Sequence, residues 1–78
     1  MTRPTDKQRW VLEQLELGGH IIGDASPRVL VTISGPQKKL QDSTYWAMQD
    51  RGWLWMAAPG VWRITGRGSA VLAARRAR

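Results

Sequence analysis

The segment DRGWLWMAAPGVWRITGRG, residues 50–68, constrains the fold of this chain more than any other part. It holds three of the five tryptophans, and they are distributed around one Pro-Gly pair. In a type II turn, proline presets φ at the second position and glycine supplies the positive φ at the third. Pro59 and Gly60 therefore predict a chain reversal, with Ala58 and Val61 on either side of it.

A hairpin built on this turn pairs Ala57 with Trp62 and Trp55 with Ile64. Because side chains alternate between the two faces of a strand, each face then collects its own set. The first face is too apolar to be left in water and predicts one wall of the core: Trp53, Trp55, Ala57, Trp62 and Ile64. The second face is unusually apolar for a solvated side: Leu54, Met56, Val61 and Arg63.

The chain has 78 residues, which predicts one small domain spanning 1–78. A domain of this size buries roughly 60–65% of the surface that its unfolded chain exposes. It has no cysteine, and its one histidine is His20, a turn residue, so we expect neither a disulfide nor a metal or other cofactor. No segment is typical of a signal peptide or a membrane span, which favours a soluble cytoplasmic protein.

Helical periodicity predicts a first helix over residues 6–17, with Thr5 as its cap and Gly18-Gly19 ending it. Its inward stripe has i, i+3, i+4, i+7 spacing: Gln8, Val11, Leu12 and Leu15. Trp10 lies about 100° from this stripe. It is either a flank of the core or an exposed aromatic residue.

The next segments change period. Residues 20–33 predict a hairpin with strands at 21–22 and 29–33 and a turn at 23–27, and "SGPQKKLQ" after it predicts a loop. A short helical turn within residues 34–42 stays an open alternative. We expect Asp42 or Ser43 to cap a second helix that Gly52 closes. Its inward stripe is expected to be Leu40, Tyr45, Met48 and Gly52, and its outer side to carry Thr44, Trp46, Ala47, Asp50 and Arg51.

Thr65 is a suitable N-cap for a last helix, in which Val71 and Leu72 would close the core. Residues 73–78 are expected to form a flexible basic tail. The charge is uneven along the chain, with net −1 over residues 1–24 and net +7 over residues 25–78. This asymmetry favours an anionic partner, and nucleic acid before a membrane, because no basic amphipathic helix is evident.

The order of these elements resembles the winged-helix family, in which "L-x-x-R-G-W/L-L … Y-R-I/L-T-x-x-G" recurs. The matching residues are Met48, Arg51, Gly52, Trp53, Leu54, Trp62, Arg63, Ile64, Thr65 and Gly68. The resemblance implies a small α+β, winged-helix-like domain in the order helix, β-hairpin, helix, β-hairpin (the wing) and C-terminal helix. It also implies a small bacterial or phage regulator of transcription that binds duplex DNA. The chain departs from the family where a hairpin replaces the second helix.

Carried onto this sequence, the resemblance implies a DNA-binding surface made by the second helix, the loop before it and the wing. Its residues are Gln37, Lys38, Lys39, Ser43, Thr44, Ala47, Arg51, Arg63 and Arg67. The wing tip Ala-Pro-Gly carries no cation for a minor groove, and the helix offers few side chains for bidentate contacts to bases. Both features count against DNA binding of the usual kind.

A different class of function stays open beside it, that of a protein-interaction module or inhibitor on the same scaffold, or a homodimer. The layout is similar to that of the small bacterial YjhX-like proteins, a family described as toxins acting on a topoisomerase. The expected partner interface is Trp46, Leu54, Met56 and Val61. Enzymatic chemistry on a small-molecule substrate is not expected, because no nucleophile stands beside a base and no phosphate-binding motif is present.

Overall fold

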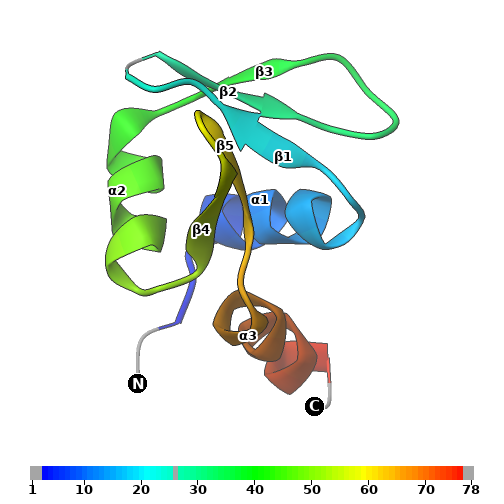
Figure 1. Cartoon of the computed structure of the whole chain (residues 1–78). Helices are drawn as coiled ribbons and strands as arrows, with labels where there is room; N and C mark the ends of the chain where they lie inside the picture. Colours follow the sequence, from blue (N-terminus) through cyan, green and yellow to red (C-terminus); the bar gives the residue numbers. More distant parts are fainter. Residues whose placement is uncertain (1–2, 26, 77–78) are drawn as a thin grey trace.

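The computed structural model describes residues 3–25 and 27–76. Over these residues the chain forms three helices and five strands (Figure 1). In chain order they are α1 (Asp6–Glu16), β1 (His20–Ile22), β2 (Arg28–Val31), β3 (Lys38–Leu40), α2 (Asp42–Asp50), β4 (Leu54–Ala58), β5 (Val61–Ile64) and α3 (Gly66–Arg76). The expected α+β class and the expected order of helices and hairpins are confirmed, and β3 is added to them.

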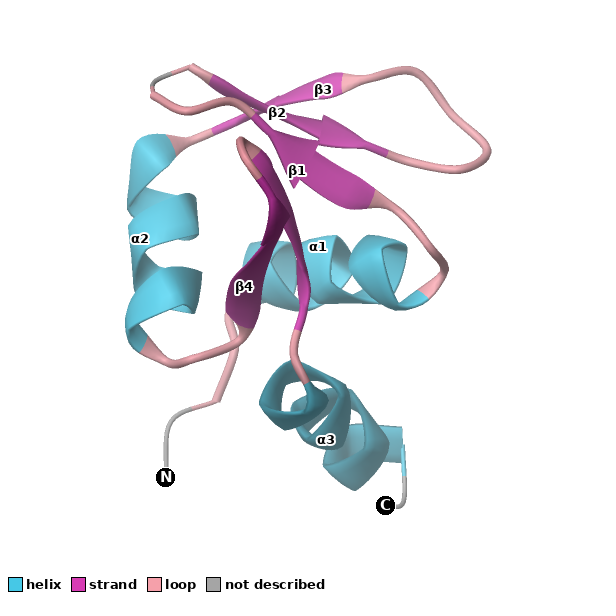
Figure 2. Cartoon of the chain, in the orientation of Figure 1, coloured by secondary structure: helices cyan, strands magenta, loops and turns pink. Residues whose placement is uncertain are grey.

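The strands form one antiparallel sheet in the order β3-β2-β1-β5-β4. The two hairpins join because β1 pairs on both sides, with Ile21 opposite Leu30 of β2 and Trp62 of β5. Figure 2 shows the sheet with the helices grouped around it. Segments from the two halves of the sequence therefore share one sheet and one core.

Residues 38–40 were expected to lie in a loop, with a short helix as the alternative, and both expectations are wrong. They form the edge strand β3, in which Lys38 pairs with Leu30 and Leu40 pairs with Arg28. Backbone pairing with β2 places Leu40 in the core, where its side chain is buried. A three-residue strand with two lysines gives too weak a local signal to be distinguished from a loop.

Helix α1 forms as the sequence predicts. Thr5 makes a capping box, in which its hydroxyl accepts from the Gln8 backbone N–H at 3.1 Å while the Gln8 side chain accepts from the Thr5 N–H at 3.0 Å. All four residues of the expected stripe are buried. The helix packs against α2, α3 and β5.

The second hairpin has a different register from the expected one. Met56 stands opposite Trp62, Trp55 opposite Arg63 and Ala58 opposite Val61. The irregularity between Met56 and Ala58 inserts one extra residue in β4, as in a β-bulge. An extra residue moves every side chain beyond it to the other face of the ribbon.

The faces assigned from the sequence are therefore wrong for β4. Leu54 was expected on the outer face but is buried at 5% exposure, and Trp55 was expected in the core but is 50% exposed. Trp53 is buried as predicted, and Trp62 and Ile64 pack against the core. Trp53 lies before β4, where the chain leaves α2, so the alternation of the strand does not govern it.

The turn at Pro59-Gly60 is confirmed, and Gly60 has the positive φ of +72° that the turn requires. Its carbonyl accepts from the Gly23 N–H at 2.9 Å, which ties the tip of β4–β5 to the turn between β1 and β2. A Cβ on Gly60 would lie 2.7 Å from Asp24 Oδ1. The tip is therefore held against the rest of the sheet.

Thr65 joins the end of α2 to the start of α3. Its hydroxyl donates to the Gly52 carbonyl at 2.6 Å and accepts from the Gly68 N–H at 3.1 Å, which confirms Thr65 as the cap of α3. Helix α3 continues to Arg76, so residues 73–76 of the expected tail are helical. Residues 77–78 lie outside the described residues.

Candidate nucleic-acid interface

Helix α2 presents acidic and apolar side chains to solvent. Asp42 and Asp50 are exposed near its two ends, and Trp46 is exposed between them. Gln41 is the N-cap and Asp42 lies in the first turn, so the expected capping by Asp42 or Ser43 is wrong. An exposed carboxylate repels phosphate, which makes this surface unfavourable for entering a DNA groove.

Three of the residues expected to read DNA from α2 are unsuited to it. Thr44, expected on the outer side, is buried, because the inward arc of the helix consists of Thr44, Tyr45 and Met48. Ala47 is half-buried and has no polar group. Arg51 donates to Gln8 Oε1 at 3.1 Å and lies 5.3 Å from the Trp53 ring, so its guanidinium links α2 to α1.

Of the helix residues expected to contact DNA, Ser43 is exposed at the start of α2. Gln37 is exposed immediately before β3. Arg63 is exposed on β5 opposite Trp55, and Arg67 is exposed in the first turn of α3, beside Gly52. The structure thus spreads the expected DNA-binding residues over several elements and does not gather them around α2.

A different group of basic residues comes together between α1 and β3. Lys38 Nζ lies 5.0 Å from the centroid of the Trp10 ring, a cation–π distance. Both residues border a hollow of about 300 Å³, whose lining is Lys7, Trp10, Val11, Leu30, Lys38, Lys39 and Leu40. We call this the α1–β3 hollow.

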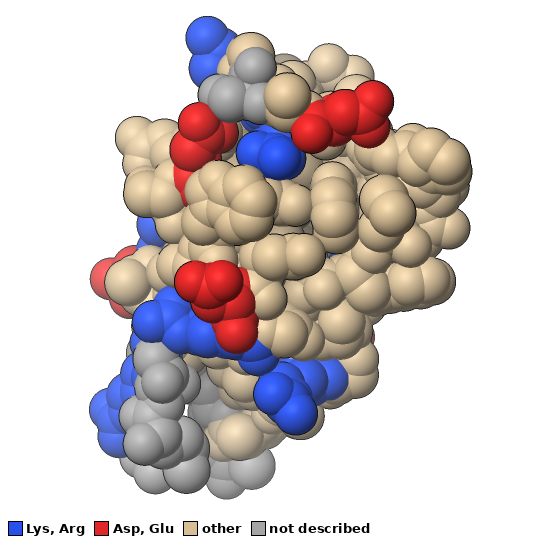
Figure 3. All heavy atoms as spheres, turned by 60° about the vertical axis from the view of Figure 1, so that its left-hand side comes forward, with Lys and Arg blue, Asp and Glu red and all other residues tan. Residues whose placement is uncertain are grey.

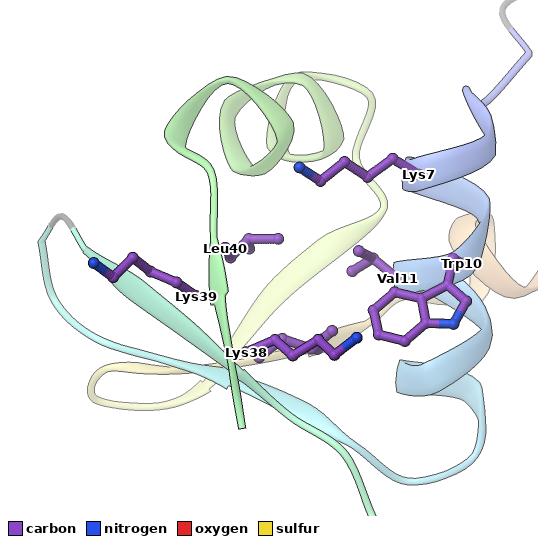
Figure 4. Close-up of a pocket in the computed structure, with 7 residues that line it drawn as sticks. Lys7, Trp10, Val11, Lys38, Lys39 and Leu40 are labelled. Carbon is purple, nitrogen blue, oxygen red and sulfur yellow. The ribbon is translucent and has the colours of Figure 1, made fainter. Parts of the chain in front are cut away.

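Figure 4 shows how the side chains of the α1–β3 hollow lie. Lys7 and Lys38 point into the space between α1 and β3, and Lys38 points toward the indole of Trp10, whereas Lys39 extends away from Trp10. Val11, Leu30 and Leu40 are buried and form its apolar base. The arrangement offers two ammonium groups, one aromatic wall and an aliphatic floor.

Sequence reasoning missed this grouping, although parts of it were visible. Lys7 and Trp10 are three residues apart on one helix, so they were already neighbours on the helical surface. Nothing in the sequence brought Lys38 to them. It reaches Trp10 only because β3 pairs with β2, and no local pattern predicts that pairing.

Arg28 is a second feature that the sequence did not reveal. Its guanidinium stacks 3.8 Å from the centroid of the buried Tyr45 ring and approaches Asp42 Oδ1 at 3.8 Å, and its side chain is 8% exposed. Arg28 therefore joins β2 to α2 and adds no positive charge to an open surface. Two arginines of the C-terminal part, Arg28 and Arg51, thus make contacts between elements within the fold.

The residues expected to form one partner interface do not lie together. Leu54 is in the core, and Val61 is half-buried on the sheet face opposite to Met56. Trp46, as predicted, and Met56 are both more than half exposed. Tyr45 connects them, because its ring contacts Trp46 at 5.1 Å and also Trp62, the residue paired with Met56.

The side of the molecule that carries α2 includes a broad uncharged area. Figure 3 shows a broad area without Lys, Arg, Asp or Glu there, with charged side chains gathered at its edges. This area contrasts with the lysines at the α1–β3 hollow. The molecule therefore has two surfaces of different chemistry, one basic with an aromatic wall and one largely uncharged.

Within residues 3–25 and 27–76, no three His, Cys, Asp or Glu side chains are grouped as a metal site. In the same part of the chain no helix has the length and apolar character needed to cross a bilayer. Comparisons with known protein families, with curated proteins and with solved structures returned no match.

Proposed function

We propose that this protein binds nucleic acid through the lysines of α1 and β3. The observation that carries the proposal is that Lys7 and Lys38, far apart in the sequence, flank the same exposed aromatic residue, Trp10. Lysines supply salt-dependent attraction to phosphates, and an aromatic ring beside them supplies a surface for bases or sugars. The exposed Lys39 and Gln37 extend the same edge of the sheet.

The winged-helix resemblance stays part of this proposal. The order helix, strands, helix, hairpin, helix supports it, and so does the link between Thr65 and Gly52, two residues of the shared pattern. A regulator of this architecture ordinarily inserts a helix into the major groove. With Asp42 and Asp50 exposed on α2, the basic edge at β3 is the better surface for the phosphate backbone.

Binding to random-sequence DNA at increasing salt tests the proposal. We expect the double substitution Lys7→Gln, Lys38→Gln to weaken binding and to reduce the log–log salt slope by about 2, because each lost phosphate contact on duplex DNA changes the slope by about 0.9. Fluorescence anisotropy with labelled DNA at about 50–200 mM salt measures both quantities.

The charge-preserving variant Lys7→Arg, Lys38→Arg is the matched control and should keep both the affinity and the salt slope. Arg67→Gln examines the basic residue beside Gly52 in the same assay. If Arg67→Gln weakened binding and the double substitution Lys7→Gln, Lys38→Gln did not, the proposed surface would be wrong. Failure of the unmodified protein to bind any nucleic acid at about 50 mM salt would contradict the function itself.

A second function, protein interaction or homodimer formation, is favoured by the exposed Trp46 and Met56. Aromatic residues and methionine are enriched at protein interfaces, and the charge-poor area around α2 fits such a contact. The similarity to YjhX-like proteins points the same way. Two results together would fit this second function. The protein would not bind nucleic acid, and sedimentation would show a dimer that Trp46→Asp dissociates.

A further inference from the structure

We infer that the α1–β3 hollow takes an unpaired base, so that the preferred ligand is single-stranded nucleic acid. The inference rests on the proposed function and makes it more specific. It starts from the composition of the hollow, which is not that of a simple phosphate site. A phosphate needs only cations and N–H donors, whereas this hollow also has an indole wall and a floor of Val11, Leu30 and Leu40.

The hollow has room for a base. The hollow has a volume of about 300 Å³, at the lower end of the volumes of small-molecule pockets, which begin at about 300 Å³. Trp10 is 38% exposed, so part of its ring is open to a ligand. A planar base has a π-face that stacks on an aromatic ring, and such stacking tolerates any base.

The charges fit the phosphates on either side of that base. Lys7 on α1 and Lys38 on β3 come from opposite sides of the hollow. In the free protein the Lys38 ammonium lies 5.0 Å from the Trp10 centroid. Because Lys38 is exposed on a long flexible stem, it can exchange the ring for a phosphate when a base arrives. A duplex cannot use the hollow in this way, since its bases are already stacked and paired.

Three nucleic acids of equal length distinguish base stacking from phosphate attraction. They are single-stranded oligothymidylate of about 12 nucleotides, an abasic sugar-phosphate strand and a duplex. One stacked base is worth about 1–3 kcal/mol, so we expect oligothymidylate to bind about 5- to 150-fold more tightly than the abasic strand. Trp10→Leu should remove this preference, so that the two single strands bind with equal affinity, because the indole is the surface on which the base stacks.

Trp55→Leu is the matched control. Trp55 is also exposed, but it lies opposite Arg63 on β4, at the edge of the sheet that is farthest from β3. It should retain the full preference for oligothymidylate. Lys7→Gln with Lys38→Gln should weaken binding of both single strands and lower the salt slope by about 1.4, at about 0.7 per phosphate.

The outcomes separate this inference from the proposed function. Equal affinity of the unmodified protein for oligothymidylate and the abasic strand would overturn base stacking, and this comparison needs no variant to fold. If Lys7→Gln with Lys38→Gln still weakens binding in that case, the proposed function stands and only the inference fails. Tighter binding of duplex than of oligothymidylate would likewise overturn it, and no binding of any of the three would overturn both.

Discussion

Thr65, Gly52 and Gly68 show what the motif residues contribute. The Thr65 hydroxyl bonds to the carbonyl of Gly52 and caps α3 through Gly68. A Cβ on Gly68 would lie 2.8 Å from Ile64 Cγ1 and 3.1 Å from the Trp53 carbonyl, so only glycine permits this close approach. Thr65, Gly52 and Gly68 thus build the junction between α2 and α3.

Gly60 gives a prediction at the same scale. Gly60→Ala places a side chain at a φ of +72° and brings its Cβ against the Asp24 carboxylate. We expect the free energy of unfolding to fall by about 1–3 kcal/mol. Urea denaturation followed by far-UV circular dichroism measures the change.

Gly66→Ala is the control for Gly60→Ala. Nothing lies within 4 Å of the Cβ that it would add, and Gly66 does not have a positive φ. It begins α3, so alanine should leave stability unchanged or raise it by up to about 1 kcal/mol. If Gly60→Ala and Gly66→Ala changed the free energy of unfolding equally, the positive φ at Gly60 and its contact with Asp24 would not explain the effect of Gly60→Ala.

Among the elements, the bulge in β4 and the residue at which β4 begins together decide which tryptophans are buried. Alternation along an ideal strand places Trp53 and Trp55 on the same face, but the first lies before the strand and the second within it. Trp53 is 3% exposed, and Trp55 is half exposed. One wall of the core is therefore made by Trp53, Leu54 and the half-buried Trp62.

The two tryptophans predict opposite responses to truncation. Trp53→Ala should lower the free energy of unfolding by about 3–5 kcal/mol, as expected for a buried aromatic residue. Trp55→Ala should cost about 1 kcal/mol or less, because half of its surface is already in water. Chemical denaturation of both variants checks this difference, and a larger loss for Trp55→Ala would show that the bulged register is wrong.

At the scale of the whole molecule, strand β1 makes one folding unit of two sequence-local halves. Ile21 is completely buried and stands between β2 and β5. The hydrogen bond from Gly23 to Gly60 adds a second link between the same halves. In three dimensions Lys7 from the N-terminal part joins Lys38 from the C-terminal part, while Arg28 is buried.

Ile21→Val tests whether the halves unfold together. The substitution removes one methylene from the core and should lower stability by about 0.5–1.5 kcal/mol. Tryptophan fluorescence reports mostly on the C-terminal half, since four of the five tryptophans lie there, and circular dichroism reports on all the helices. Both probes should shift to the same new midpoint. Separate midpoints would show two independent units.

The elements whose signals are local could be predicted from the sequence. Helix α1 follows from an apolar stripe and a capping residue, the hairpin turn from Pro59-Gly60, and the α3 cap from Thr65, because each depends on neighbours within a few residues. The exposure of Trp46 followed from the same helical periodicity.

Three features depend on contacts between distant segments and could not be predicted: the bulged register of β4, the existence of β3 and the meeting of Lys7, Trp10 and Lys38. A bulge shifts a register without any composition signal, and an edge strand forms because a neighbouring strand offers its backbone groups. The candidate site is therefore a product of strand pairing. No local sequence pattern distinguishes Lys7, Trp10 and Lys38. They form one hollow because β3 pairs with β2 and lies beside α1.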